Sequence, residues 1–291
     1  MRRYIVVMLL ILGVFGCSEK STIENTIENK SSGNTMPQIS VQLWSIKEDV
    51  KKDIKGTLTQ LAEMGFDGVE FANEFGNYAD KPEELKSLLD ELKLVGSAAH
   101  VSFEQLDDTN FDKTVAFYQK LDIKYLIVPW DERAWSPDGI DTVTKLLNEH
   151  AEKLAQYGMR VGFHNHQYEF ADYKGTTYWD YLAKNTSDNV ILQLDVGWVI
   201  NVGKDPVDYV KRYPGRTLTT HYKIYRSEEE KDMPVIIGDD ETDWSALIKA
   251  NMSVGGTEWI VIEQEQYPKD LSHIQSVAKS MQGLQKIIKK L

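Results

Sequence analysis

Short apolar runs alternate with longer stretches of helical spacing along most of the chain. The runs that predict strands lie at 39–44, 68–71, 96–101, 125–129, 160–166, 190–196, 217–223 and 259–265. Between them apolar residues recur every three or four positions, as at Leu58, Leu61 and Met64, which is typical of amphipathic helices. Gly65 and Gly158 each precede a predicted strand and suit the end of a helix. The alternation predicts βα units around a parallel sheet.

Residues 38–291 contain eight such repeats without an internal linker or a second compositional regime. A (β/α)8 barrel typically uses about 250 residues. The sequence therefore predicts a single-domain α/β protein, a (β/α)8 TIM barrel over 38–291. A doubly wound open sheet is the alternative, because a strand count from one sequence can be wrong by one or two.

The first residues carry the pattern of an export signal. Arg2 and Arg3 precede a short apolar run over 4–15, which Gly16 and Cys17 follow. The run is too short to span a bilayer comfortably, and Val14-Phe15-Gly16-Cys17 resembles the lipobox of bacterial lipoproteins. We predict a lipoprotein signal peptide over 1–16 and lipidation of Cys17. A plain signal peptide with an incidental cysteine is the alternative.

Residues 17–37 are polar and predict a flexible tether, because they cannot bury enough apolar surface to fold alone. Cys17 is the only cysteine, which excludes an intrachain disulfide. Together these features predict an exported protein that reaches the membrane only through its lipid anchor and faces the periplasm or the cell surface.

The charge balance narrows the choice of partners. The chain has 45 Asp+Glu against 33 Lys+Arg, a net charge of −12, which becomes −14 without the two arginines of residues 1–16. Such a field repels phosphate backbones, where counterion release supplies most of the affinity. We expect no nucleic-acid partner.

Polar side chains stand at the carboxyl ends of the later predicted strands, where a TIM barrel carries its chemistry. They are His100, His164, His166, Glu169, Asp195, His221, Lys223, Glu263 and Glu265. Alternate residues of a strand share one face, so His164 and His166 are expected to point together toward the barrel mouth, as are His221 with Lys223 and Glu263 with Glu265.

Four of these residues come from successive strands, the fifth to the eighth, and form a candidate metal site: His164, Asp195, His221 and Glu263. Any one of them alone is commonly a hydrogen-bonded or helix-capping residue. Their coincidence on four strands favours one divalent metal, and two imidazoles with two carboxylates suit Mn²⁺, Mg²⁺, Co²⁺, Fe²⁺ or Zn²⁺ rather than a thiolate-type site.

Aromatic residues near other strand ends suggest a wall for a sugar ring, although core packing would explain them equally well. These are Trp44, Trp130 and Trp198. His150 and His273 lie in helical patterns and are interpreted as surface or packing residues.

The same residues resemble the sugar phosphate isomerase/epimerase group of the xylose isomerase-like TIM barrel superfamily over essentially all of 38–291. The resemblance rests on Gly68-Val-Glu70-Phe71, Gly162-Phe-His164-Asn-His166-Gln-Tyr-Glu169-Phe, Gln193-Leu-Asp195-Val-Gly-Trp198, the segment from Arg216 to His221-Tyr-Lys223, Gly238-Asp-Asp-Glu-Thr-Asp243-Trp244 and Ile262-Glu263-Gln264.

The resemblance implies one divalent metal held by residues of strands five to eight, commonly Glu, Asp, His and Glu. Carried over, the ligands are Asp195, His221 and Glu263, with His164 where the family usually has a catalytic glutamate. Ile224 also departs from the aspartate that usually follows the His-x-Lys element.

Roles for the remaining strand-end residues follow from the same resemblance. Glu263 would be one acid–base group, and His166, Glu169 or Lys223 would supply the second proton transfer or stabilise an oxyanion. Glu70, His100, Trp130 and Trp198 are the candidates for binding the substrate.

Such a site suits proton transfer beside a ketone, because a divalent metal stabilises the enediolate and a carboxylate or imidazole moves the proton. Return of the proton to the other face is epimerisation, return to the adjoining carbon is isomerisation, and loss of a β substituent is elimination. We predict a metal-dependent isomerase or epimerase of a neutral keto-sugar. A 3-keto-glycoside lyase and a non-catalytic sugar-binding lipoprotein are the alternatives, while the endonuclease IV type of the same superfamily is disfavoured by the charge.

Overall fold

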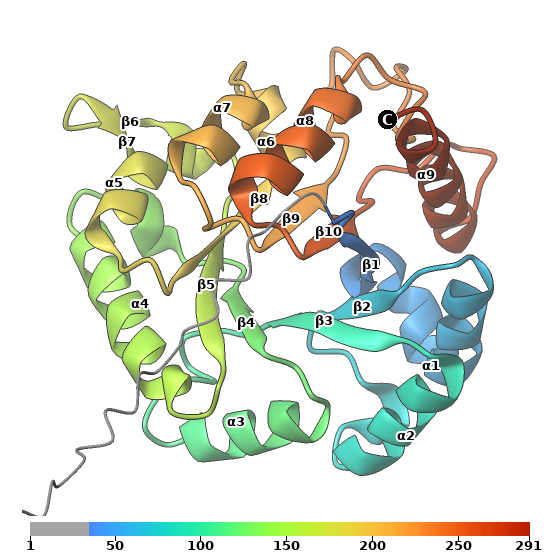
Figure 1. Cartoon of the computed structure of the whole chain (residues 1–291), viewed down its shortest axis with the longest axis horizontal. Helices are drawn as coiled ribbons and strands as arrows, with labels where there is room; N and C mark the ends of the chain where they lie inside the picture. The colour runs from blue at the N-terminus through green and yellow to red at the C-terminus, as the bar shows by residue number, and fades with distance from the viewer. Residues whose placement is uncertain (1–34) are drawn as a thin grey trace, which may run out of the picture. The chain divides into compact units, whose positions relative to one another are not determined.

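Eight parallel strands close into a barrel in the computed structural model, which describes residues 35–291. The predicted signal peptide, Cys17 and the tether up to residue 34 lie outside the described residues. Around the barrel the order is β1-β10-β9-β8-β5-β4-β3-β2 (Figure 1). The strands are β1 Gln38–Gln42, β2 Gly68–Phe71, β3 Val95–His100, β4 Tyr125–Val128, β5 Arg160–His164, β8 Ile191–Asp195, β9 Thr219–Tyr222 and β10 Trp259–Ile262. The predicted single (β/α)8 barrel is confirmed.

The α-helices surround the barrel, as Figure 1 shows. They are α1 Lys47–Glu63, α2 Pro82–Leu92, α3 Phe111–Lys120, α4 Ile140–Ala155, α5 Tyr178–Asn185, α6 Val196–Asn201, α7 Pro206–Arg212, α8 Trp244–Ala250 and α9 His273–Ile288. A small antiparallel hairpin, β6 Asp172–Tyr173 with β7 Thr176–Thr177, was not predicted.

Local sequence accounts for the way the helices begin and end. Pro82 opens α2 at a position where a missing N–H costs nothing. Ser272 and Gln275 form a reciprocal capping box at the start of α9. Gly65 and Gly158 have φ of 86° and 68°, the left-handed conformation that ends a helix at little cost for glycine. Both predicted helix ends are confirmed.

The barrel interior has an apolar layer and a polar layer. The apolar cluster inside the barrel consists of Ala98, Tyr125, Ile127, Ile191, Leu218, Trp259 and Val261. Gly162 on β5 leaves room there, since a Cβ would lie 2.6 Å from Ile127 Cδ1 and 2.8 Å from Ile191 Cβ. Toward the carboxyl ends the buried residues become polar, from Gln42 and Glu70 to His221. The fold therefore concentrates its polar groups at one mouth.

Seven of the eight predicted strands end one to three residues earlier than expected. The strand at 39–44 stops at Gln42, because Leu43–Ile46 forms a 3-10 helix in which the Gln42 side chain caps the Trp44 backbone N–H. The strand at 190–196 stops at Asp195, whose side chain caps α6. Those at 160–166, 217–223 and 259–265 stop at His164, Tyr222 and Ile262. His166, Lys223 and Glu265 therefore stand on loops, where strand alternation does not set their direction.

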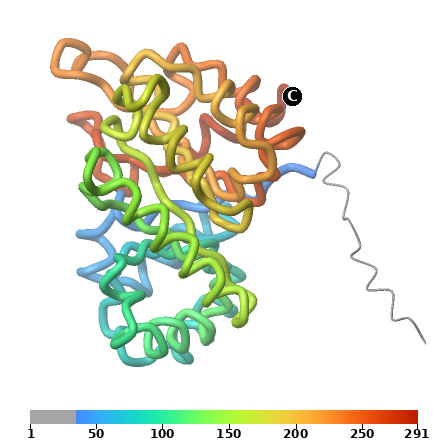
Figure 2. The backbone as a smooth tube through the Cα atoms, turned by 90° about the vertical axis from the view of Figure 1, so that its left-hand side faces the viewer, coloured from blue at the N-terminus to red at the C-terminus, as the bar shows by residue number. Residues whose placement is uncertain are grey.

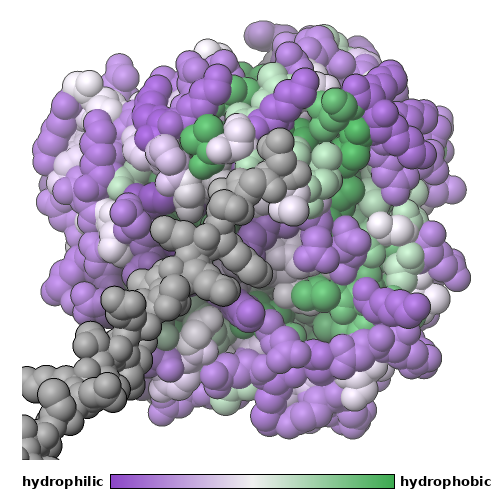
Figure 3. All heavy atoms as spheres, viewed as in Figure 1, coloured by the Kyte–Doolittle hydropathy of each residue, from purple (hydrophilic) through white to green (hydrophobic). Residues whose placement is uncertain are grey.

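The first described residues leave the barrel on the side where the C-terminus lies (Figure 2). Hydrophilic residues cover most of the face seen in Figure 3, with hydrophobic residues gathered toward its right-hand part. Among the described helices none has the length and apolarity needed to cross a membrane.

Candidate active site and metal centre

Four side chains from β5, β8, β9 and β10 converge at the barrel mouth: His164, Asp195, His221 and Glu263. One potential ligand atom from each lies within 4.8 Å of all the others, and all four residues are buried. His164 Nε2 is 3.6 Å from Asp195 Oδ2, and His221 Nδ1 is 3.0 Å from Glu263 Oε2. These are the four residues predicted as metal ligands.

The Asp195 carboxylate has two roles at once. Its Oδ1 accepts the backbone N–H groups of Gly197 and Trp198, which caps α6 as the helix begins. Its Oδ2 faces the cluster, next to His164 and Lys223. The structural role considered for this residue and its predicted role as ligand are therefore compatible.

Lys223 is fully buried among three carboxylates. Its Nζ lies 2.7 Å from Asp195 Oδ2, 3.2 Å from Glu263 Oε2 and 3.1 Å from Glu265 Oε2. Burial opposes its charge, but the carboxylates outweigh burial and raise the pKa of Lys223. Lys223 thus forms three ion pairs inside the site itself.

His221 lies between two carboxylates. Its Nε2 is 2.7 Å from Glu70 Oε1, while its Nδ1 faces Glu263. Burial opposes protonation, but Glu70 and Glu263 together raise the pKa of His221 to about 10. Burial would also raise the pKa of the Glu263 carboxyl, yet Lys223 and His221 hold it well below its usual range.

The donor set fits a divalent cation. Four carboxylates, those of Glu70, Asp195, Glu263 and Glu265, share the cations Lys223 and His221. Burial accordingly raises the pKa of Asp195 to about 7 and raises that of Glu265. Two imidazoles and two carboxylates around one point, with carboxylate charge in excess, are what a hard or borderline divalent ion requires.

A pocket of about 270 Å³ opens above the cluster. It is lined by Trp44, Ala72, Asn73, His100, Pro129, Trp130, His164, His166, Glu263 and Glu265. The exposed Trp44 and Trp130 form walls, and Lys47 Nζ covers one Trp44 face at 3.5 Å from the ring centroid. Of the predicted substrate-binding residues, His100 and Trp130 line this pocket.

Besides Asp195, His221 and Lys223, three further predicted site residues lie outside the pocket lining. Glu70 is fully buried beneath the cluster, where other side chains occupy its oxygens. Trp198 is almost fully buried and packs on His166, Tyr225 and Lys223. Glu169 is buried, and its Oε2 accepts the His166 backbone N–H at 2.9 Å. Glu169 therefore positions the His166 loop.

The sequence placed Glu265 at the barrel mouth without a specific role, and it gave no role to Gln42 and Gln193. Glu265 lines the pocket, and its position two residues after Glu263 was the available signal. Gln193 lies two residues before Asp195 and is buried in the interior. Gln42 gave no signal, because only the closed barrel brings it to Glu70 and His100.

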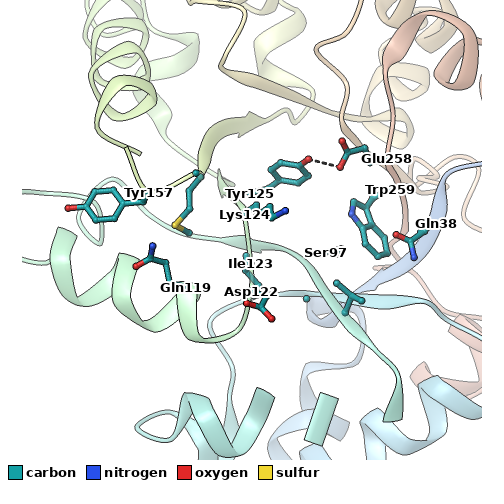
Figure 4. A pocket seen from close by; sticks show the side chains of 14 residues that line it. Gln38, Ser97, Gln119, Asp122, Ile123, Lys124, Tyr125, Tyr157, Glu258 and Trp259 are labelled. Atoms are coloured by element: carbon teal, nitrogen blue, oxygen red, sulfur yellow. Dashed lines mark hydrogen bonds between the residues drawn. The ribbon is translucent and has the colours of Figure 1, made fainter. Parts of the chain in front are cut away.

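A larger cavity of about 780 Å³ lies at the other end of the strands, where Tyr125 donates a hydrogen bond to Glu258 at 2.5 Å (Figure 4). Its lining includes Gln38, Val95 and Trp259, each the first residue of a strand. Among the described residues no cluster of three or more His, Cys, Asp or Glu suited to a metal occurs there. The candidate metal clusters of the described residues lie at the opposite mouth.

The remaining histidines pack as expected. His150 is buried against Phe103 and Phe111, and His273 stacks on Tyr267. Arg216 is also buried and donates to backbone oxygens of Ala183 and Val190, which ties α5 to the sheet.

The sequence matches the family described as Xylose isomerase-like TIM barrel over residues 58–287. The chain belongs to this family. Among solved structures, a sugar phosphate isomerase/epimerase from Parabacteroides distasonis superposes with a TM-score of 0.73 at 24% identity, over 88% of this chain and 96% of that one. The IolI protein with a bound zinc atom superposes with a TM-score of 0.63 at 15% identity, over 87% and 98%.

A curated relative, inosose dehydratase of Lactiplantibacillus plantarum, is 28% identical over 144 residues. The match covers 44% of this chain and 47% of the relative, so the chain spans about half the length of that relative. The chain thus combines membership of this family with four clustered candidate metal ligands.

Proposed function

We propose that this protein is a divalent-metal-dependent isomerase or epimerase of a neutral keto-sugar, working through an enediolate. The observation that carries the proposal is the convergence of His164, Asp195, His221 and Glu263 within 4.8 Å beside a pocket lined by further proton-transfer groups. These four side chains would hold the ion. When bound, it would polarise a ketone and acidify the neighbouring C–H.

Two groups near opposite sides of the pocket can move the proton. Glu265 follows β10 and His166 follows β5, and two strands, β8 and β9, separate β5 from β10 around the barrel. Burial lowers the pKa of His166 to about 3, so its neutral imidazole can accept a proton. Burial raises the pKa of Glu265, so its carboxyl holds a proton to higher pH than an exposed glutamate and can return one.

The pocket favours a neutral ring as substrate. In the part of the chain that the structure describes, no lysine or arginine is among its lining residues. Trp44 and Trp130 offer apolar faces of the kind on which sugar C–H groups stack. A volume of about 270 Å³ suits one sugar or cyclitol ring rather than a longer oligosaccharide.

Elimination is the second candidate reaction. His164 stands where the family usually has a glutamate, so the usual pair of catalytic glutamates is incomplete. The relative named inosose dehydratase points the same way. In this reading a β hydroxyl or an aglycone leaves after the same proton abstraction.

We also propose export and anchoring through Cys17, on the pattern of residues 1–17. No lysine or arginine belongs to the described pocket lining, which agrees with a neutral substrate. We propose that this substrate lies outside the inner membrane.

The test is product analysis with Mn²⁺-loaded protein and a panel of free ketoses, 3-keto-glycosides and keto-cyclitols. A new epimer or isomer supports the proposal, whereas an unsaturated keto product or a released aglycone supports elimination. If the sugars bind unchanged whether or not chelator is present, the protein is a sugar-binding lipoprotein instead.

A further inference from the structure

We infer that Glu70 and Gln193 form an orienting pair, which fixes the N–H position of His164 and the ring orientations of His164 and His221. Its significance for metal binding rests on the proposed function. The hydrogen-bond arrangement itself can be tested without a metal.

Glu70 is an acceptor surrounded by donors. Its Oε1 lies 2.6 Å from Gln42 Nε2, 2.7 Å from His221 Nε2 and 3.0 Å from His100 Nε2, and its Oε2 lies 2.8 Å from Gln193 Nε2. No side chain fits this position better than a carboxylate, because both of its oxygens accept. The register of β2 against β3 shifts between Val69 and Glu70, an irregularity of the kind that re-aims a side chain.

The carboxylate determines which way the Gln193 amide faces. Because Glu70 accepts, the amide nitrogen of Gln193 must face it, and that nitrogen also lies 3.2 Å from Thr219 Oγ1. Gln193 Oε1 then faces His100 Nε2 and His164 Nδ1, each at 2.9 Å. An amide oxygen accepts, so His164 must carry a hydrogen on Nδ1.

The ring nitrogens that remain are those that face the candidate ligands. With Nδ1–H donated to Gln193, His164 directs its Nε2 lone pair toward Asp195. With Nε2–H donated to Glu70, His221 directs Nδ1 toward Glu263. Such outer partners usually orient the histidines of metal sites and fix their tautomers.

The pair also argues against a second possible ligand group. His100, His164 and His221 each have a ring nitrogen, and these three nitrogens all lie within 4.8 Å of one another. In that group His100 Nε2, His164 Nδ1 and His221 Nε2 point at Gln193 Oε1 or Glu70 Oε1. The orienting pair therefore selects the four-residue site over a three-histidine site.

The deciding measurement is long-range ¹H–¹⁵N NMR of the histidine rings in the metal-free protein at neutral pH. We expect the neutral His164 ring to carry its proton on Nδ1. Q193M removes the acceptor with a side chain of similar length, and E70Q puts an amide N–H₂ among donors. In both variants His164 should shift toward the Nε2–H form. E258Q is the control, since it removes a carboxylate that bonds Tyr125 at the opposite end of the barrel.

Zinc affinity, measured by competition with a chromophoric chelator, gives a second readout. Q193M and E70Q should bind Zn²⁺ about 10–100-fold more weakly, and E258Q within about twofold of wild type. A wild-type His164 protonated on Nε2, or tautomers and affinities unchanged in both variants, would overturn the inference. If Nδ1–H is present but wild type binds no divalent ion, the proposed function fails and the orienting pair stands. The wild-type spectrum decides even if one variant does not fold.

Discussion

Burial sets the protonation of the titratable side chains that support the site. Glu169 is fully buried, and its Oε1 has no hydrogen-bond partner, so burial raises its pKa to about 7 even though Oε2 accepts the His166 N–H. In the folded protein Glu169 therefore holds its proton to higher pH than in the unfolded chain, where its pKa is 4.5. This links the stability of the His166 loop to pH.

Because the folded state binds more protons between pH 4.5 and 7, Glu169 should reduce the free energy of unfolding as pH rises through this window. The loss is at most about 3 kcal/mol and levels off above pH 7. E169Q keeps an acceptor for His166 and cannot ionise. Urea unfolding at pH 5 and pH 8 should therefore show a smaller decrease for E169Q than for wild type. Equal decreases would refute the raised pKa.

Glu263 is the residue whose removal should cost the most activity. E263Q removes a ligand and a charged neighbour of Lys223, which keeps its contacts with Asp195 and Glu265. We expect turnover to fall at least about 100-fold while the circular dichroism melt stays cooperative. E84Q, on the exposed face of α2, is the matched control and should change neither. Unchanged turnover in E263Q would exclude its catalytic role.

Sequence reasoning found the residues that act locally and missed those that act through the closed barrel. His164, Asp195, His221 and Glu263 were predictable, because each lies at or beside the end of an apolar strand. The role of Glu70 was not, since its partners lie on β1, β3, β8 and β9 and their convergence depends on strand order and register. A motif showed that Glu70 matters but not which way it faces.

At the scale of elements, β5 is the strand whose packing most directly fixes a ligand. Gly162 lies two residues before His164, and Ile127 and Ile191 fill the space that its missing Cβ leaves. The strand cores were predictable from apolar runs and helix ends from glycine. The early ends of β1 and β8 were not, because the side chains of Gln42 and Asp195 cap the helices that follow.

G162A should destabilise the protein by about 1–3 kcal/mol, because the added methyl would meet Ile127 Cδ1 at 2.6 Å and the Ile191 backbone oxygen at 2.9 Å. It should also weaken metal binding by displacing His164. The control is G158A, where a Cβ meets nothing within 4 Å and only the positive φ of 68° costs about 1 kcal/mol. Urea unfolding and zinc titration check both variants. A G162A protein with wild-type zinc affinity would show that β5 tolerates the change without moving His164.

At the scale of the molecule, the chain enters the barrel at the end opposite its pocket. Gln38, the first residue of β1, lines the cavity at the amino-terminal ends of the strands, whereas the candidate ligands lie at the carboxyl ends. The described chain therefore begins at the end of the barrel away from the candidate ligands.

The anchoring proposal predicts that C17S is no longer recovered with membranes, whereas wild type is recovered with them and carries a lipid mass on its first mature residue. Fractionation and intact mass spectrometry check this. An S18A variant should behave like wild type. Wild-type protein with a free Cys17 thiol would contradict lipidation.

The central claim is that this barrel removes a proton from carbon beside a ketone with the help of a divalent ion at the four-residue site. The most direct measurement is proton NMR of candidate keto-sugars in D₂O with Mn²⁺-loaded protein, after removal of the paramagnetic ion. We predict that deuterium enters at the carbon adjoining the ketone. This incorporation should not occur when the metal is removed by a chelator or when E263Q replaces the wild type. Absence of exchange from every substrate, although a metal is bound by His164, Asp195, His221 and Glu263, would contradict the account.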